Sequence, residues 1–142
     1  MMKLSYSKYL LLLATTCLLA FSCGPDNSPD DVAEAFLFRY FIELNQRGAM
    51  ELSTGLAAKK LQDEIELTQN IRMEPNLDLS KHRPFLDYEL MNQSEEDGIV
   101  TFFYEITVEV EGGPDRKSQF VLSTIELDGQ WQVNNYDSFL NK

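Results

Sequence analysis

Residues 100–110 have the sequence VTFFYEITVEV, in which apolar and polar side chains alternate along most of the stretch. A period of two is typical of a β-strand that buries one face and leaves the other in water. The even-numbered positions are all apolar, and most of the odd-numbered positions are threonine or glutamate. The stretch therefore predicts a long strand that covers a core with one face.

Three further strands accompany this one and are separated by short turns. The pattern predicts strands over residues 86–91, 100–110 and 117–127, and a last strand that begins at residue 131. Turn-forming sequences occupy positions 95–98 (EEDG), 111–115 (EGGPD) and 128–129 (DG). Asp-Gly is among the strongest signals for a two-residue hairpin turn. Residues 117–127 carry apolar side chains on both faces, which suits a central strand. The second half of the chain thus predicts an antiparallel meander of four strands.

A helix precedes the strands and begins at a capping sequence. Ser28 can cap this helix, Pro29 suits its first position, and the two aspartates that follow favour the positive end of the helix dipole. An apolar stripe at a spacing of four comes next, formed by Val32, Phe36, Tyr40 and Leu44. The stripe predicts one helix that runs to about Gln46 and that Gly48 terminates.

A second helical region covers residues 49–72, with a break near Gly55. Its apolar row consists of Ala57 or Ala58, Leu61, Ile65 and Thr68. A solvated charged face is predicted on the opposite side, formed by Lys59, Lys60, Gln62, Asp63, Glu64 and Glu66. Residues 73–84 contain two prolines and an asparagine and predict a loop.

Helices followed by antiparallel strands indicate the α+β class, with the helices packed on one face of the sheet. Trp131 is the only tryptophan. We expect it in the core, between the last strand and the first helix, so that Trp131→Ala would cost about 3–5 kcal/mol of folding free energy.

The two ends of this domain resemble those of a known family. Residues 28–36 (SPDDVAEAF) and 127–133 (LDGQWQV) are similar to the sequences that open and close the bacterial domain of unknown function DUF4878. That family occurs in small lipoproteins and belongs to the nuclear-transport-factor-2-like (cystatin-like) superfamily. The resemblance implies a cone, in which a curved four-stranded sheet wraps around a long helix. It implies no particular reaction, because the family has no established activity. The chain departs from the family at residues 48–50 (GAM), where Gly-Asp-Tyr is usual.

The amino terminus predicts export and lipid attachment. Lys3 and Lys8 come first, and a 13-residue apolar run then ends at Phe21. A stable membrane span needs about 20 residues, so this layout indicates a secretory signal that is removed. The junction Ala20-Phe21-Ser22-Cys23 resembles the bacterial lipobox, in which the cysteine becomes the first residue and carries the lipid.

The domain boundaries follow from this junction. We expect a signal peptide in residues 1–22, a lipidated Cys23 with a flexible tether in residues 23–28, and the folded domain in residues 29–142. Cys17 is a rival lipid site, although the apolar run before it is shorter. Cys17 would leave with the signal, so the mature chain is expected to contain no disulfide.

The charge of the mature chain limits its partners. Removal of Lys3 and Lys8 with the signal changes the formal net charge from −11 to −13. A surface this acidic repels nucleic acid and anionic headgroups, so neither is an expected partner. Membrane attachment must then come from acyl chains, and two or more such chains hold a protein stably at a membrane. The expected location is the cell envelope, at the outer membrane if the cell has two. An envelope protein, a glycan and a small apolar ligand stay open as further partners.

No catalytic or metal-binding pattern stands out in the sequence. The single histidine, His82, lies between two cations and before a proline, which predicts a solvated loop position. One histidine and no mature free cysteine exclude a zinc cluster built from these residues, and no cofactor is expected.

Two functions from different classes compete. The preferred one is a non-catalytic binding or interaction module of unknown ligand, held at the envelope by its lipid. The alternative is a small pocket enzyme of the ketosteroid-isomerase-like or dehydratase type, with pocket groups drawn from Tyr40, Tyr88, Tyr104 and Asp87. The three tyrosines are also the candidate ligand-binding residues. A deep pocket with a buried ionisable group beside a tyrosine or histidine would favour the enzyme, whereas a shallow or purely apolar mouth, or a filled core, would favour the module.

Overall fold

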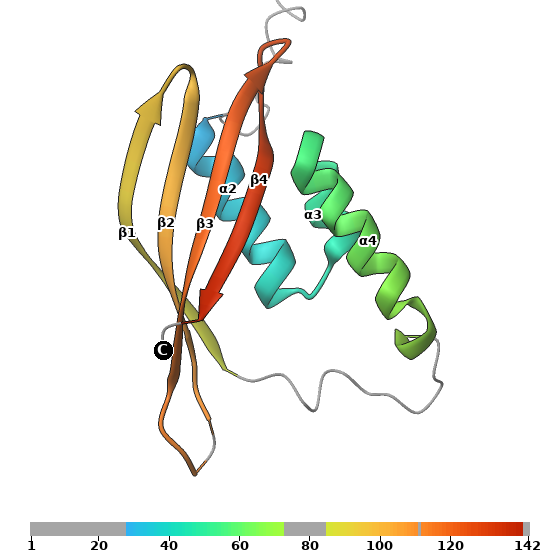
Figure 1. Ribbon diagram of the computed structural model, residues 1–142, viewed down its shortest axis with the longest axis vertical. Helices are drawn as coiled ribbons and strands as arrows, with labels where there is room; N and C mark the ends of the chain where they lie inside the picture. The colour runs from blue at the N-terminus through green and yellow to red at the C-terminus, as the bar shows by residue number, and fades with distance from the viewer. Residues whose placement is uncertain (1–27, 73–84, 111, 141–142) are drawn as a thin grey trace, which may run out of the picture.

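A computed structural model describes residues 28–72, 85–110 and 112–140 of the chain. Helices come first and a four-stranded antiparallel sheet follows, which confirms the α+β class (Figure 1). The predicted signal, Cys17, Cys23, most of the tether and the predicted loop with His82 lie outside the described residues. No helix within the described ranges is long and apolar enough to cross a membrane.

The first helix starts as predicted and ends earlier than predicted. Helix α2 (Pro29–Leu37) has Ser28 as its N-cap, whose side chain accepts a hydrogen bond from the Asp31 backbone N–H at 3.1 Å. A π-helical turn, η2 (Phe38–Ile42), continues it, and the N–H of Glu43 donates to the carbonyl of Phe38 at 2.9 Å. Leu44 then adopts a positive φ of 53°, which ends the helix before the expected Gln46.

Two helices cover the predicted second helical region, and the first of them begins before residue 49. Helix α3 (Gln46–Glu51) is capped by the side chain of Asn45, which accepts from the N–H of Gly48 at 2.9 Å. Gly48 is buried inside α3 and does not terminate the first helix as expected. Helix α4 (Gly55–Arg72) begins at Gly55, whose φ of +53° confirms the predicted break.

The sheet has the strand order β1 (Leu86–Glu96), β2 (Ile99–Val108), β3 (Arg116–Leu127) and β4 (Gln130–Leu140). Each strand pairs with its neighbour in the chain, so the predicted meander is confirmed, with β2 and β3 in the centre. Asp97-Gly98 and Asp128-Gly129 form the two tight turns, and all four residues have positive φ. That conformation matches the right-handed twist of the strands that such turns join.

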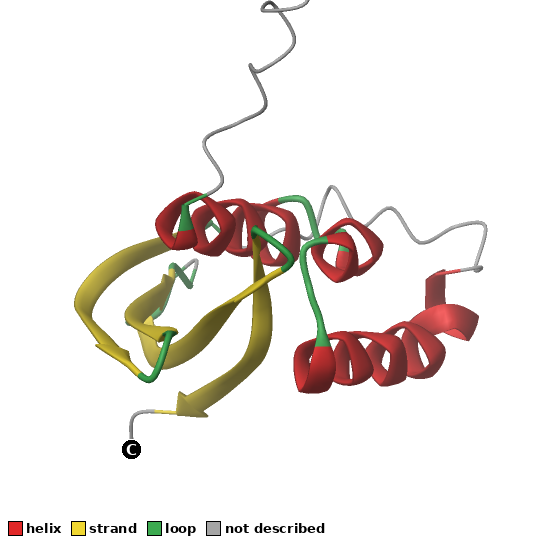
Figure 2. Cartoon of the chain, turned by 90° about the horizontal axis from the view of Figure 1, so that it is seen from above, coloured by secondary structure: helices red, strands yellow, loops and turns green. Residues whose placement is uncertain are grey.

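The core lies between the inner face of the sheet and α2. Along β2 the even-numbered residues from Val100 to Ile106 are buried. Phe102 pairs with the buried Leu122 of β3, and Tyr104 pairs with the buried Phe120. Helix α2 packs against β3 and β4, and Figure 2 shows the sheet curling around it. The largest fully buried side chain of α2 is Phe36.

Trp131 packs against this core but is only half-buried, so the expectation of a central tryptophan is wrong in part. It pairs with Glu126 next to the last turn, at the end of the sheet. The centre of the core is aromatic without it, formed by Phe36, Phe102, Phe120 and Tyr136.

Helix α4 lies beyond β4 rather than over the face of the sheet (Figures 1 and 2). The link between α3 and α4 pairs with the β4 edge, where the N–H of Thr54 donates to the carbonyl of Val133 at 2.8 Å. The N–H of Val133 in turn donates to the carbonyl of Leu52 at 2.9 Å. These bonds occupy part of the sheet edge and position α4 beside β4.

Candidate functional site

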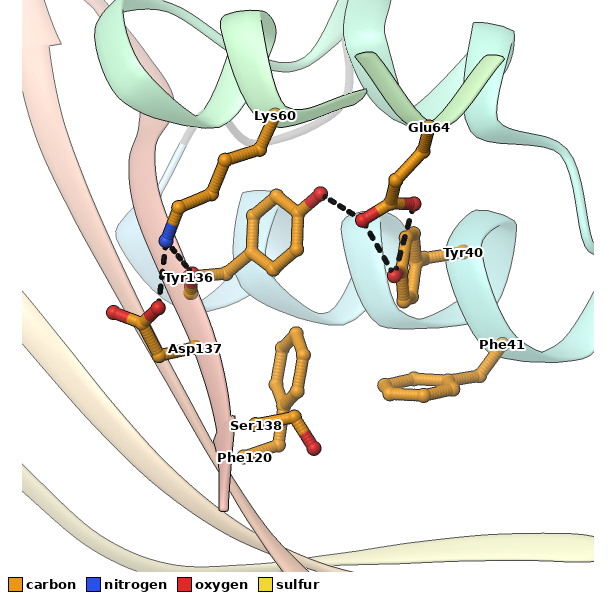
Figure 3. A pocket seen from close by; sticks show the side chains of 8 residues that line it. All are labelled: Tyr40, Phe41, Lys60, Glu64, Phe120, Tyr136, Asp137 and Ser138. Carbon is orange, nitrogen blue, oxygen red and sulfur yellow. Dashed lines mark hydrogen bonds and ion pairs between the residues drawn. The ribbon is translucent and has the colours of Figure 1, made fainter. Parts of the chain in front are cut away.

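A cavity of about 320 Å³ opens where η2, α4, β3 and β4 meet (Figure 3). It is lined by aromatic and charged side chains: Tyr40, Phe41, Lys60, Glu64, Phe120, Tyr136, Asp137 and Ser138. The π-helical turn supplies Tyr40 and Phe41, which are adjacent in the chain and both reach the cavity. A π-turn is wider than an α-turn and is often found at functional sites.

A carboxylate between two phenols forms one side of the cavity. The hydroxyl of Tyr40 donates to the two carboxylate oxygens of Glu64, at 3.1 and 3.0 Å. The hydroxyl of Tyr136 donates to Oε1 of the same carboxylate at 2.7 Å. Glu64 therefore joins the first helix, α4 and β4 through three side chains, as Figure 3 shows.

An ammonium group with all its protons engaged forms the opposite side. Nζ of Lys60 donates to Oδ1 of Asn135 at 3.0 Å, to the carbonyl of Tyr136 at 2.6 Å and to Oδ1 of Asp137 at 2.6 Å. It also lies 5.4 Å from the centre of the Tyr136 ring. A lysine has three N–H donors, so these three acceptors use its full capacity.

Four aromatic rings contact one another at the cavity in a closed circuit. The ring centres of Tyr40 and Phe41 are 4.9 Å apart, and those of Phe41 and Phe120 are 5.0 Å apart. The circuit closes through Tyr136, which lies 5.8 Å from Phe120 and 5.4 Å from Tyr40. Aromatic pairs at these distances stabilise each other beyond the area that they bury. The rings thus give the cavity a rigid apolar wall.

Burial keeps the two phenols of the site protonated. Burial, followed by the charge of Glu64, raises the pKa of Tyr40 well above its ordinary value. Burial and the hydrogen bond to Glu64 raise the pKa of Tyr136 in the same direction. A general acid or base works best with a pKa near the working pH, so these shifts move both phenols away from that role. These two phenols are therefore better suited to donating hydrogen bonds than to moving protons.

The three tyrosines predicted as site residues fall in two places. Tyr40 lies in the cavity, whereas Tyr88 and Tyr104 lie together on the inner face of β1 and β2, with ring centres 6.2 Å apart. Burial, followed by the charge of Glu34, raises the pKa of Tyr104, which is 4 % exposed. Asp87 is exposed on the outer side of β1 and does not reach the cavity.

The charged residues of the site were not predicted from the sequence. Lys60 and Glu64 were expected on a solvated face, but both are half-buried and point towards β4 and η2 (Figure 3). A signal for Glu64 existed, because it follows the buried Ala57 and Leu61 at helical spacings of seven and three. No such signal predicts Tyr136 as its partner, since β4 is remote in the chain.

Within residues 28–72, 85–110 and 112–140, no group of three or more histidine, cysteine, aspartate or glutamate side chains could hold a metal ion. The Tyr40–Glu64–Tyr136 group brings a single carboxylate.

The chain was compared with known protein families and with curated proteins. No family model matches it. No curated protein matches it either.

Proposed function

We propose that this protein is a lipid-anchored binding module of the cell envelope, which holds a small molecule in the cavity without catalysis. The pairing of the polar groups that line the cavity supports this function most. Glu64 accepts hydrogen bonds from two phenols. The three N–H groups of Lys60 donate to Asn135, Tyr136 and Asp137. The pairing holds these groups in fixed positions beside an apolar wall, and a few precisely placed polar groups in an apolar cavity are typical of small-molecule sites.

The fold supports a finer structural proposal. We propose that the domain is a nuclear-transport-factor-2-like cone of the DUF4878 kind, since its sheet curls around α2 (Figure 2). The cavity opens beside the π-turn that ends the first helix. We propose that this place is the open end of the cone.

The alternative function is a pocket enzyme of the ketosteroid-isomerase-like or dehydratase type. One observation favours it, namely that a half-buried carboxylate, Glu64, lies beside Tyr40 and Tyr136 in an open cavity. The direction of the phenol pKa shifts argues against it, as does the position of Tyr88 and Tyr104 away from the cavity.

A fragment screen tests the binding function. Tyrosine and phenylalanine ring signals of the full chain would be followed by NMR while soluble fragments of neutral, cationic and anionic kinds are added. We expect some fragments to shift the ring signals of Tyr40, Phe41, Phe120 and Tyr136, with those of Tyr88 as an internal control. If no fragment at millimolar concentration shifts the four cavity rings, the binding function is wrong.

Cys23→Ser tests the anchor. The lipid is the only expected membrane attachment, and two or more acyl chains bind a membrane stably. Without acyl chains, we expect a soluble, acidic domain. We expect the wild-type protein to fractionate with membranes and the variant either to become soluble or to stay unprocessed. Cys17→Ser is the matched control and should not change the fractionation. Mass spectrometry of the mature amino terminus gives the direct measurement, and an unmodified terminus at another residue would contradict the anchor.

A further inference from the structure

We infer that the ligand of this cavity is a small organic cation, an amine or quaternary ammonium with an apolar part. This inference rests on the proposed binding function and names the chemical class of its ligand. Three properties of the cavity support it: its ammonium and phenol donors are occupied, its carboxylates keep free acceptor capacity, and its wall is aromatic.

The cavity has no cationic donor left for an anion. Among the lining residues of the described chain, the one positive charge belongs to Lys60, and its three protons go to Asn135, the Tyr136 carbonyl and Asp137. The two phenol protons of the site go to Glu64. A carboxylate or phosphate could gain a bond from the ammonium or from a phenol only by breaking one of these pairs, which costs the desolvation of the group left unpaired. The site therefore disfavours anionic ligands.

The acceptors of the cavity, in contrast, keep free capacity. An ionised carboxylate offers about four lone-pair sites, and Glu64 receives protons from only two hydroxyls. Asp137 accepts from Lys60 through Oδ1, and its Oδ2 accepts only a long bond of 3.4 Å from Asn135. Two carboxylates and one ammonium leave the lining with a formal charge of −1. A cation supplies both the missing charge and, in an amine, the missing donors.

The aromatic wall has the chemistry that organic cations prefer. Tyr40, Phe41, Phe120 and Tyr136 present π-systems whose faces attract a cation within about 6 Å, and quaternary ammonium ligands are held in this way. The protein already uses this attraction once, between Lys60 and the Tyr136 ring at 5.4 Å. The overall formal charge of −11 adds a field that draws cations towards the surface and repels anions.

Three isosteric probes separate charge from shape: choline, the neutral 3,3-dimethylbutan-1-ol and the anionic 3,3-dimethylbutanoate. Each would be titrated into the full chain in a maltoside detergent at low salt, with the four cavity rings followed by NMR. We expect choline to bind about tenfold more tightly than the neutral alcohol, and the carboxylate not to bind. The difference in affinity between choline and the neutral alcohol should shrink at high salt, because ions screen the charges of a partly open site.

A matched pair of variants assigns the effect to the cavity. Glu64→Gln removes the carboxylate charge and should lower choline affinity about tenfold while the affinity for the neutral alcohol stays unchanged. Glu66→Gln removes the same charge from an exposed position two residues along α4 and should change neither affinity. If Glu64→Gln unfolds, the comparison of the three probes on the wild type still tests whether the cavity prefers a cation.

The outcomes separate this inference from the binding function itself. Equal binding of choline and the alcohol, or tighter binding of the carboxylate, overturns the cation inference and leaves a binding cavity. No shift with any of the three probes also overturns it, while the fragment screen alone decides whether the cavity binds other molecules. Preferential binding of choline that Glu66→Gln reduces as much as Glu64→Gln would place the cation elsewhere and overturn the assignment to this cavity.

Discussion

Phe36→Ala should lower the free energy of unfolding by about 3–5 kcal/mol, the usual cost of removing a fully buried phenylalanine. Phe36 has no exposed surface and lies at the centre of the aromatic core. Its ring is stacked on Tyr40, with centres 5.6 Å apart, and lies 5.3 Å from the ring of Tyr136. The substitution would leave a cavity under two residues of the proposed site. Typical domains have a total stability of about 5–15 kcal/mol, so the expected loss is a large part of it.

Urea unfolding followed by circular dichroism measures this loss as a shift of the midpoint at constant slope. Phe38→Ala is the matched control, because Phe38 lies two residues along the chain and is 47 % exposed. We expect it to cost at most about 1 kcal/mol. Trp131→Ala should fall between the two, since Trp131 is half-buried at the end of the sheet. If Trp131→Ala cost as much as Phe36→Ala, the original prediction of a central tryptophan would be supported instead.

Local patterns predicted the sheet well because strands and tight turns depend on near neighbours. The alternation in residues 100–110 identified the buried face of β2, and Phe102 and Tyr104 are buried as that pattern requires. Asp-Gly at 128–129 predicted a turn that demands positive φ at both positions, and the structure has it. Ser28 predicted the helix start for the same reason, since an N-cap needs only a partner three residues away.

The end of the first helix could not be predicted in this way. No proline or glycine occurs between Phe38 and Glu43, so the apolar stripe appeared to continue through Leu44. The chain instead widens into a π-turn and reverses at Leu44, whose positive φ no glycine signals. Packing of Tyr40 and Phe41 against β3 and β4 accompanies this turn, as their ring contacts with Phe120 and Tyr136 show. Tertiary contacts of this kind leave no local sequence pattern.

Of the residues that line the candidate site, Tyr40 alone was predicted. The reason is again that the other contacts depend on the tertiary fold. The charge pattern of α4 indicated a solvated face because a helix in isolation has no β4 beside it. In the structure Lys60 and Glu64, one turn apart, bridge to Tyr136 and its neighbours more than 70 positions away in the sequence. The pairing of remote charged residues depends on the fold and therefore becomes visible only with it.

The described tyrosines should resist ionisation until the protein unfolds in alkali. Burial is the first cause that raises the pKa of Tyr40, Tyr88, Tyr104 and Tyr136 above the ordinary value of about 10. In the unfolded chain each phenol ionises near that value. The native mature protein, from which Tyr6 and Tyr9 are expected to leave with the signal, should therefore show little at pH 10 of the tyrosinate absorbance at 295 nm that the same chain shows when unfolded in urea. Half-ionised tyrosines in a still-folded protein at pH 10 would contradict the burial of these phenols.

The same shifts fix the sign of the stability change with pH. A phenol whose pKa is raised on folding contributes its full stabilisation below pH 10, and this contribution is lost as the pH rises above 10. For Tyr104 and Tyr136, which are 4 % and 6 % exposed, the loss is up to about 1.4 kcal/mol per phenol for each pH unit. Tyr136→Phe removes one of these groups, so its unfolding free energy should fall less steeply than that of the wild type between pH 10 and 11.5.

Tyr88→Phe is the control, because that phenol is only half-buried and its removal should change the slope less. The lysines are the same in both variants and in the wild type, so their contribution cancels when the slopes are compared. A slope for Tyr136→Phe identical to that of the wild type would mean that Tyr136 already ionises in the folded state. Its hydroxyl could not then donate to Glu64 through this range, and the carboxylate that the cation inference requires would lose one of its two phenol partners.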